Sequence, residues 1–121
     1  MNLRELIKNV QQRTGFSDDE SKDALQMMVE ALAVRLNERE RLSFAAELLE
    51  ELQDLALAVY PTHENSSMDI VKQFMEMEHI EANRALQQIQ AAWQALKDVL
   101  SSSKLNHLRS QLPSSLVAYL N

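Results

Sequence analysis

Glu76 and His79 are the residues whose types and spacing come closest to a metal site in this sequence. They lie three residues apart, so on a helix they would share one face. Carboxylate-bridged di-iron bundles use such a pair from each of two helices, together with two further glutamates. The equivalent residues in the first half of the chain are Gln12 and Gly15, which cannot complete such a site. We therefore expect no metal and no cofactor, and we interpret the pair as solvated side chains at a helix end.

The sequence also lacks the residue pattern of a nucleophilic active site. It contains no cysteine, which excludes thiol catalysis, a thiolate metal site and disulfides. The serines fall in expected helix caps and polar runs, where hydroxyl groups satisfy free backbone groups. His63 is expected in a linker and His107 on a short helix, so neither is placed to activate a serine. Because the single glycine, Gly15, also excludes glycine-rich phosphate loops, we expect that the chain is not an enzyme.

A stripe of acidic side chains is the remaining candidate for function. Glu47, Glu50, Glu51 and Asp54 fall at positions i, i+3, i+4 and i+7, which share one face of a helix. One interpretation is a docking surface for a basic protein partner, because a field of one sign steers association. The other is an ordinary solvated helix face, since exposed charges carry little structural information. We hypothesise a partner surface at these four residues, and no catalytic, cofactor-binding or metal site.

Four methionines and the single tryptophan also have two interpretations. Met27, Met28, Met75 and Met77 could line an adaptable groove, because methionine tolerates varied partners, or they could fill the core. We favour core filling and expect Met28 and Met77 on inner helix stripes. Trp93 is expected to be the largest core residue, with an indole N–H that needs a partner if it is buried.

The composition narrows the class of partner. The 121 residues carry 18 acidic and 12 basic side chains, a formal net charge of −6. Nucleic acids and anionic membranes bind through Lys and Arg, so we expect neither as the main partner. The excess negative charge lies in residues 1–60, which hold twelve acidic and seven basic side chains. No secretory signal and no bilayer-spanning apolar run is recognised, so we expect a cytoplasmic protein.

An internal repeat is the strongest architectural signal. Ala24-Leu25-Gln26 recurs as Ala85-Leu86-Gln87, an offset of 61, while flanking apolar residues recur at an offset of 64. The difference predicts a three-residue loop change on each side of the central helix. Each half has about 60 residues and would be marginally stable alone, so the copies are expected to share one core. We predict a single domain over residues 1–121, with repeat one at 1–60, a linker at 61–65 and repeat two at 66–121.

Apolar residues follow helical spacing, and no segment alternates with a period of two. The sequence therefore predicts an all-α bundle of about eight helices, a tandem duplication of a four-helix unit packed about a pseudo-two-fold axis. Thr14-Gly15 is expected to end the first helix. The capping-box spacing of Ser17 and Glu20 is expected to begin the second helix, which should end near Asn37. Ser67 is a reasonable cap for the first helix of repeat two.

The segment after Arg39 has two possible shapes. Leu49 occupies the position that Pro113 holds in repeat two, where the proline predicts a new helix start. A straight helix from Arg39 to Val59 and a bend at Leu49 are both compatible with the apolar spacing. We favour a bend in both repeats, because a shared core should impose similar geometry. The apolar seam of this segment consists of Leu42, Ala45, Leu49, Leu52, Ala56 and Val59, and it is ended by Tyr60-Pro61.

Two short motifs add a resemblance to a known family. They are the turn Thr14-Gly15-Phe16-Ser17 and the segment Leu112-Pro113-Ser114-Ser115-Leu116. Together with the duplicated Ala-Leu-rich helix, they resemble the bacterial family called domain of unknown function 2267 over nearly the whole chain. The chain departs from the family where Leu49 replaces an expected proline and where His79-Ile80 lacks a glycine. The resemblance implies an all-helical bacterial domain with no assigned activity and no catalytic residues.

These observations favour a non-enzymatic interaction or regulatory module that presents helix faces to a protein partner. A homodimer is also possible, because an uncovered apolar stripe usually marks an interface. The alternative function is a carrier of a small apolar ligand, held between the repeats by Met28, Met77 and Trp93.

Overall fold

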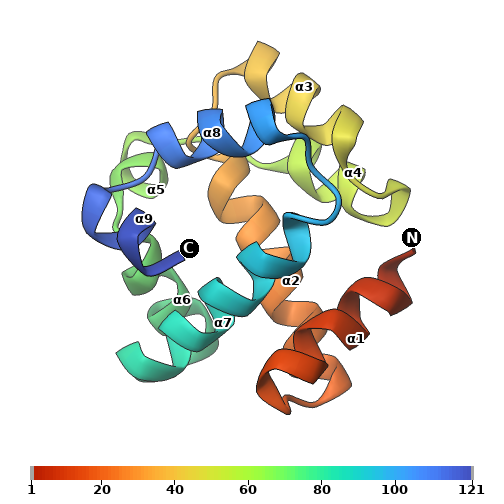
Figure 1. Cartoon of the computed structure of the whole chain (residues 1–121). Coiled ribbons are helices and arrows are strands. Elements are labelled where there is room, and N and C mark those ends of the chain that lie inside the picture. Colours follow the sequence, from red (N-terminus) through yellow and green to blue (C-terminus); the bar gives the residue numbers. More distant parts are fainter. Residues whose placement is uncertain (1, 121) are drawn as a thin grey trace.

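The computed structural model describes residues 2–120, and the regular elements of this part of the chain are helices (Figure 1). The expected all-α class is therefore confirmed. Met1 and Asn121, the ends of the expected domain, lie outside the described residues. In chain order, the nine helices of residues 2–120 are α1 (Leu3–Thr14), α2 (Asp18–Ala33), α3 (Glu38–Glu47), α4 (Glu50–Ala58), α5 (His63–Ser67), α6 (Ile70–Glu78), α7 (Ala82–Leu96), α8 (Ser102–Ser110) and α9 (Ser114–Leu120).

The turn between α1 and α2 follows from its local sequence. Gly15 has a φ of 77°, in the left-handed region, and its N–H donates to the Gln11 carbonyl at 2.7 Å, which ends α1. The Ser17 hydroxyl accepts from the Glu20 N–H at 3.1 Å and begins α2 as expected. The second half of the expected capping box does not form, because the Glu20 carboxylate accepts hydrogen bonds from Arg84 and Gln88 of α7 instead.

The second helix ends earlier than the sequence suggested. α2 ends at Ala33. The N–H groups of Arg35 and Leu36 then donate to carbonyls three residues earlier, so the chain after α2 forms a tighter, 3₁₀-type turn. Asn37 belongs to α3 instead. Its side chain accepts from the Glu40 N–H at 2.8 Å, and the Glu40 carboxylate accepts from the Asn37 N–H at 2.9 Å. This complete capping box fixes the start of α3.

The expected bend between Arg39 and Val59 is confirmed. α3 ends at Glu47, and the next residue has an extended backbone before α4 begins. One member of the predicted seam was wrong, because Leu42 has an exposed fraction of 56%. Phe44 is fully buried, and Leu42 lies two residues before it, on nearly the opposite side of the helix.

The segment expected to be a linker, residues 61–65, holds the start of α5, the helix beyond the expected eight, and α5 continues into the segment expected to begin repeat two. The Thr62 hydroxyl accepts from the Asn65 N–H at 3.0 Å, and the Asn65 side chain accepts from the Thr62 N–H at 2.7 Å. This reciprocal cap nucleates the short helix. The expected cap at Ser67 was wrong, because Ser67 lies in α5 and Asp69 caps α6. The Asp69 carboxylate is favoured there, since it accepts two N–H groups at the positive helix end.

α2 and α7 pack against each other at the centre of the molecule (Figure 1). α1 packs against both of them, α6 packs mainly against α7, and α4 and α9 pack on α2 and α7 respectively. α8 lies beside α3, to which it is hydrogen-bonded, at the end of the molecule away from α1 and α6 (Figure 1). One cluster of buried residues draws on both halves of the chain, and its largest fully buried side chains are Trp93, Phe44 and Phe74. None of the described helices has the length and apolar character needed to cross a bilayer.

The second half of the described chain repeats most of the helix boundaries and buried positions of the first half, although α6 begins 67 positions after the start of α1. The residues that end α1 and α6 are 64 positions apart, as are the N-caps of α2 and α7 and those of α3 and α8. The loops before the two central helices have the same length. Equivalent pairs at this offset are Gly15 and His79, Ser17 and Glu81, Leu25 and Ile89, Leu32 and Leu96, Asn37 and Ser101, and Leu48 and Leu112.

The central helices therefore do not follow the predicted offset of 61. The buried residues of α2 recur in α7 at 64, and Trp93 corresponds to Val29 rather than to Leu32. The repeated Ala-Leu-Gln triplet was misleading, because burial rather than residue identity sets which positions are equivalent. The three-residue loop changes predicted on both sides of the central helix are therefore absent, because the N-caps before and after it are all 64 positions apart.

Contacts between the halves are reciprocal. The His107 imidazole bonds the Glu40 carboxylate, and the Lys104 ammonium donates to the Ser43 hydroxyl, each at 2.5 Å. Because Glu40 and Lys104 are equivalent at the offset of 64, as are Ser43 and His107, these bonds are one contact made twice, as across a two-fold axis. This geometry agrees with the expected pseudo-symmetry, while tandem duplication of the sequence stays a prediction.

Candidate functional site

Three of the four expected partner residues lie on the outer side of α4. Its inner side carries Leu52 and Ala56, which are fully buried, and the exposed positions of the helix cover roughly a third of its circumference. The outer side combines carboxylates with two large apolar side chains, of which Leu57 is 48% and Tyr60 84% exposed. We define the α4 surface as the exposed residues Glu50, Glu51, Asp54, Leu57, Ala58 and Tyr60.

Glu47, the fourth expected partner residue, has a different environment. The bend after α3 separates it from α4, so the four carboxylates do not form a continuous stripe on one helix. The Glu47 carboxylate accepts hydrogen bonds from the Ser101 N–H at 2.7 Å and from the Ser101 hydroxyl at 3.1 Å. Because the same hydroxyl accepts from the Lys104 N–H, Glu47 orients the N-cap of α8.

The carboxylates of the α4 surface are free of ion pairs within the described residues. The ion pairs of residues 2–120 join Glu20 to Arg84 and Glu40 to His107. The negative charge of α4 therefore faces solvent without neutralisation by a neighbouring side chain. Such a surface can attract basic groups, but it holds no nucleophile and no general acid or base in a cleft.

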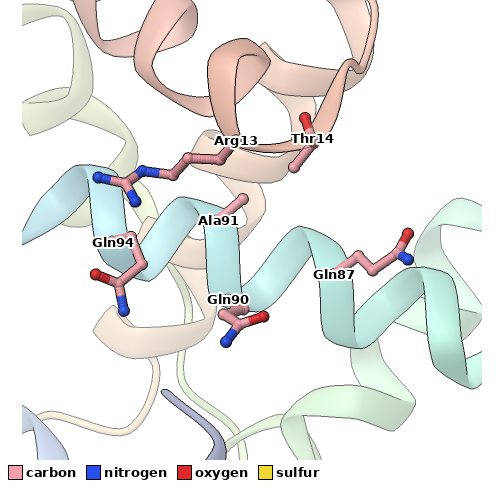
Figure 2. Close-up of a pocket in the computed structure, with 6 residues that line it drawn as sticks. All are labelled: Arg13, Thr14, Gln87, Gln90, Ala91 and Gln94. Carbon is pink, nitrogen blue, oxygen red and sulfur yellow. The ribbon is translucent and has the colours of Figure 1, made fainter. Parts of the chain in front are cut away.

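A polar cleft of about 470 Å³ lies between the end of α1 and the outer side of α7 (Figure 2). Figure 2 shows the Arg13 side chain extended over α7 near Ala91. This cleft was not predicted from the sequence, although its three glutamines follow the helical spacing i, i+3 and i+7. The lining residues are Arg13, Thr14, Gln87, Gln90, Ala91 and Gln94.

Several polar groups of the cleft already bind other parts of the protein. Gln90 and Gln94 donate to backbone carbonyls in the last turn of α9, at 3.2 and 2.7 Å. The Arg13 Nε donates to the Asn9 side chain at 2.8 Å. No carboxylate or imidazole is among the lining residues. Gln90 and Gln94 therefore hold α9 against α7, and the described residues that line the cleft include no histidine or carboxylate to act as a general acid or base.

Glu76 and His79, the metal-like pair, do not share a helix face. His79 lies beyond the end of α6 in the left-handed region, with a φ of 55°. Both side chains are exposed, as expected. Within residues 2–120, no group of three or more histidine and carboxylate side chains is arranged to hold a metal ion.

Among residues 2–120, the rings of the other two histidines make no hydrogen bond to a serine hydroxyl. His63 is an exposed residue at the start of α5, and the His107 ring binds the Glu40 carboxylate rather than a serine. The pKa of Glu40 is lowered, first by the hydrogen bond from the Asn37 N–H and then by His107. This pair is a structural contact between α3 and α8.

A second group of carboxylates lies where α2, α6 and α7 meet. Arg84 donates two hydrogen bonds to Glu20, at 2.8 and 2.6 Å, and its guanidinium lies 4.2 Å from the centre of the Phe16 ring. The Arg84 hydrogen bond is the main cause that lowers the pKa of Glu20, and Gln88 adds to it. Burial raises the pKa of Glu78, and nearby carboxylates of α2 raise it further. The bonded Glu20 is therefore held ionised as a structural link between the halves.

The methionines only partly follow the expected burial. Met28 is fully buried and Met27 and Met75 are half-buried, but the inward position expected for Met77 was wrong, because 69% of it is exposed. Met77 lies in the last turn of α6, where it borders, with Met27, a small surface cleft beside α2. Trp93 is fully buried as expected, but its indole N–H has no hydrogen-bond partner among the described residues.

Comparison with protein families places residues 3–119 in one family, described as "Uncharacterized conserved protein (DUF2267)". This match covers both halves of the chain and agrees with the resemblance found in the sequence. No curated protein and no solved structure matches the chain.

Proposed function

The chain belongs to the DUF2267 family of uncharacterised conserved proteins, and from its surface we propose that it is a non-enzymatic interaction or regulatory module. In this proposal the α4 surface binds a protein segment that carries basic and apolar side chains. The supporting observation is that Glu50, Glu51 and Asp54 are exposed and lack ion-pair partners within residues 2–120, beside the exposed Leu57 and Tyr60.

Charge and apolar contact would have separate roles in this binding. The unpaired carboxylates raise the rate at which a basic segment arrives, and salt weakens this effect. Leu57 and Tyr60 supply area that leaves water on binding, and tyrosine is a residue type that often contributes much of the affinity of an interface. The negative net charge of −6 works against nucleic acid as the partner. A cytoplasmic location is part of the same proposal.

The test is a comparison of captured proteins between two charge-matched variants. The first variant is Glu50→Gln, Glu51→Gln and Asp54→Asn, which neutralises the α4 surface and leaves Glu47 to cap α8. The control is Asp23→Asn, Glu64→Gln and Glu76→Gln, three exposed carboxylates elsewhere on the molecule. At low salt, we expect the wild type and the control to capture the same basic proteins. The first variant should fail to capture them. Identical sets of captured proteins for all three forms would refute the proposal that the α4 surface binds a protein partner.

The alternative, a carrier of a small apolar ligand, has weaker support. Met28 and Trp93 are fully buried in the core, so they do not border an open pocket as this alternative required. The cleft beside Met77 has a volume of about 200 Å³, which is smaller than the pockets of about 300–1,000 Å³ that hold small molecules in proteins. Native mass spectrometry with a fatty-acid panel distinguishes the two functions, because a carrier would show bound masses.

A further inference from the structure

A second cleft, of about 430 Å³, lies where the chain after α2 meets the α5–α6 corner and the α8–α9 corner. It differs from the cleft of Figure 2 because its cation is half-buried rather than exposed. Hydroxyl groups from two separate corners of the fold line it. Its polar residues are Arg35, Ser66, Ser67, Asp69, Ser110 and Gln111.

Arg35 is a desolvated cation with no carboxylate in direct contact among the described residues. One Nη donates to the Ala31 carbonyl at 2.5 Å, and the other donates to the Met68 carbonyl. Both acceptors are neutral. Burial lowers the pKa of Arg35, and the charge of Asp69 offsets this only in part. A buried charge is unfavourable unless it is paired, and a guanidinium has five N–H donors, so Arg35 retains donors for an anion.

The three serine hydroxyls can reorient towards a ligand by rotating away from their present acceptors. Each now donates to a backbone carbonyl in its own helical turn, at 2.6 Å for Ser66 and 2.5 Å for Ser67 and Ser110. Such local bonds to the backbone can be exchanged for a bond to a ligand when the hydroxyl rotates. The carbonyl that Ser66 binds already accepts a backbone N–H at 3.0 Å, so it stays satisfied when the hydroxyl rotates.

Among the described residues that line this cleft, Asp69 is the one with an acidic side chain, and its charge opposes the binding of an anion. One of its carboxylate oxygens accepts from the Val71 and Lys72 N–H groups, at 2.9 and 3.2 Å. Its charge is therefore partly compensated by the N-terminus of α6, where a negative charge is stabilised. Asp69 reduces anion binding in the cleft without preventing it.

We propose that this cleft binds the phosphate group of a small molecule, with Arg35 as the cationic anchor and Ser66, Ser67 and Ser110 as hydroxyl donors. A guanidinium matches the oxygens of a phosphate through paired N–H donors. Donors that come from separate corners of the fold surround a tetrahedral oxyanion better than a planar carboxylate. The cleft is also larger than a phosphate group, so the remainder of the molecule has room beside it.

The test is a titration of the ¹⁵N-labelled full chain with inorganic phosphate, with sodium chloride at matched ionic strength as the reference and acetate as the carboxylate probe. We expect saturable shifts at the amides of Ser66, Ser67, Ser110 and Gln111, with a dissociation constant on the order of 1 mM for so small a ligand. Arg35→Gln should weaken this binding at least tenfold, whereas Arg13→Gln, which removes an exposed guanidinium of the other cleft, should leave it unchanged.

Arg35 also ties the end of α2 to the α5–α6 corner, so Asp69→Asn provides an independent variant that leaves this tie in place. Asparagine caps helices as well as aspartate does, and the change removes one like charge from the cleft. We expect phosphate to bind several-fold more tightly, on the order of fivefold. The proposal is overturned if phosphate shifts the amide signals near all exposed lysines and arginines without saturation. It is also overturned if Asp69→Asn binds phosphate with unchanged affinity, or if acetate binds as tightly as phosphate.

Discussion

Replacement of Glu47 by alanine should destabilise the fold, although Glu47 is the last residue of a helix, where a negative charge is unfavourable. Two hydrogen bonds join its carboxylate to Ser101 at the start of α8. Solvent weakens both bonds at this half-exposed acceptor, so together they contribute about 1.5 kcal/mol, the low end of the range for a single hydrogen bond to a charged group. Removal of the negative charge from the C-terminal end of α3 stabilises the fold by about 0.5 kcal/mol. Glu47→Ala should therefore lower the free energy of unfolding by about 1 kcal/mol, because the loss of the hydrogen bonds outweighs the gain from removing the charge.

The assay is urea unfolding followed by the fluorescence of Trp93, the single tryptophan of the chain. A loss of about 1 kcal/mol corresponds to a fall in the melting temperature of about 4 °C for a chain of this length. Asp54→Ala is the matched control, because Asp54 is exposed in α4, and it should change stability by about 0.5 kcal/mol or less. Hydrogen exchange at the Ser101 amide should also become faster in Glu47→Ala. Equal stability of Glu47→Ala and Asp54→Ala, with unchanged exchange at Ser101, would refute this role of Glu47.

Four further predictions concern backbone strain and titration. His79→Gly should stabilise the fold by up to about 1 kcal/mol in urea unfolding, because it relieves the strain of a side chain on a left-handed backbone. Gly15→Ala should destabilise the fold by about 1 kcal/mol. This loss should come from backbone strain alone, since an added Cβ would meet no atom within 4 Å. The folded state lowers the pKa of Glu20 from 4.5, so its ionised carboxylate stabilises the fold above that pH; Glu20→Gln should flatten the loss of stability that urea midpoints show below pH 4.5. The folded state raises the pKa of Glu78 above 4.5, so its ionisation destabilises the fold as the pH rises; Glu78→Gln should be more stable than the wild type at pH 7, with the difference vanishing at acid pH, and a difference that persists in acid would contradict this cause.

The sequence predicted the helix boundaries best where a local interaction sets them. Gly15 ends α1, Ser17 begins α2, and the position of Pro113 correctly indicated the bend near Leu49. α5 was missed because its capping box pairs Thr62 with an asparagine instead of the glutamate or glutamine that defines the usual pattern.

Predictions that depended on tertiary contacts were less successful. The acidic spacing was visible in the sequence, but Glu47 is drawn to Ser101, a residue 54 positions away, once the chain bends after α3. The cleft around Arg35 could not be predicted, because its polar groups come from three corners that only the fold brings together. Met77 has the correct helical spacing for burial, but the last turn of α6 lies at the surface.

The most direct test of this account is whether either half of the chain folds alone. One core contains residues from both halves, and the central contact of α2 with α7 joins them. We predict that peptides 1–60 and 61–121 each show weak far-ultraviolet circular dichroism with no cooperative thermal transition, and that mixing them restores the helical signal and the transition. Cooperative unfolding of either half in isolation, with a stability similar to that of the full chain, would contradict a shared core.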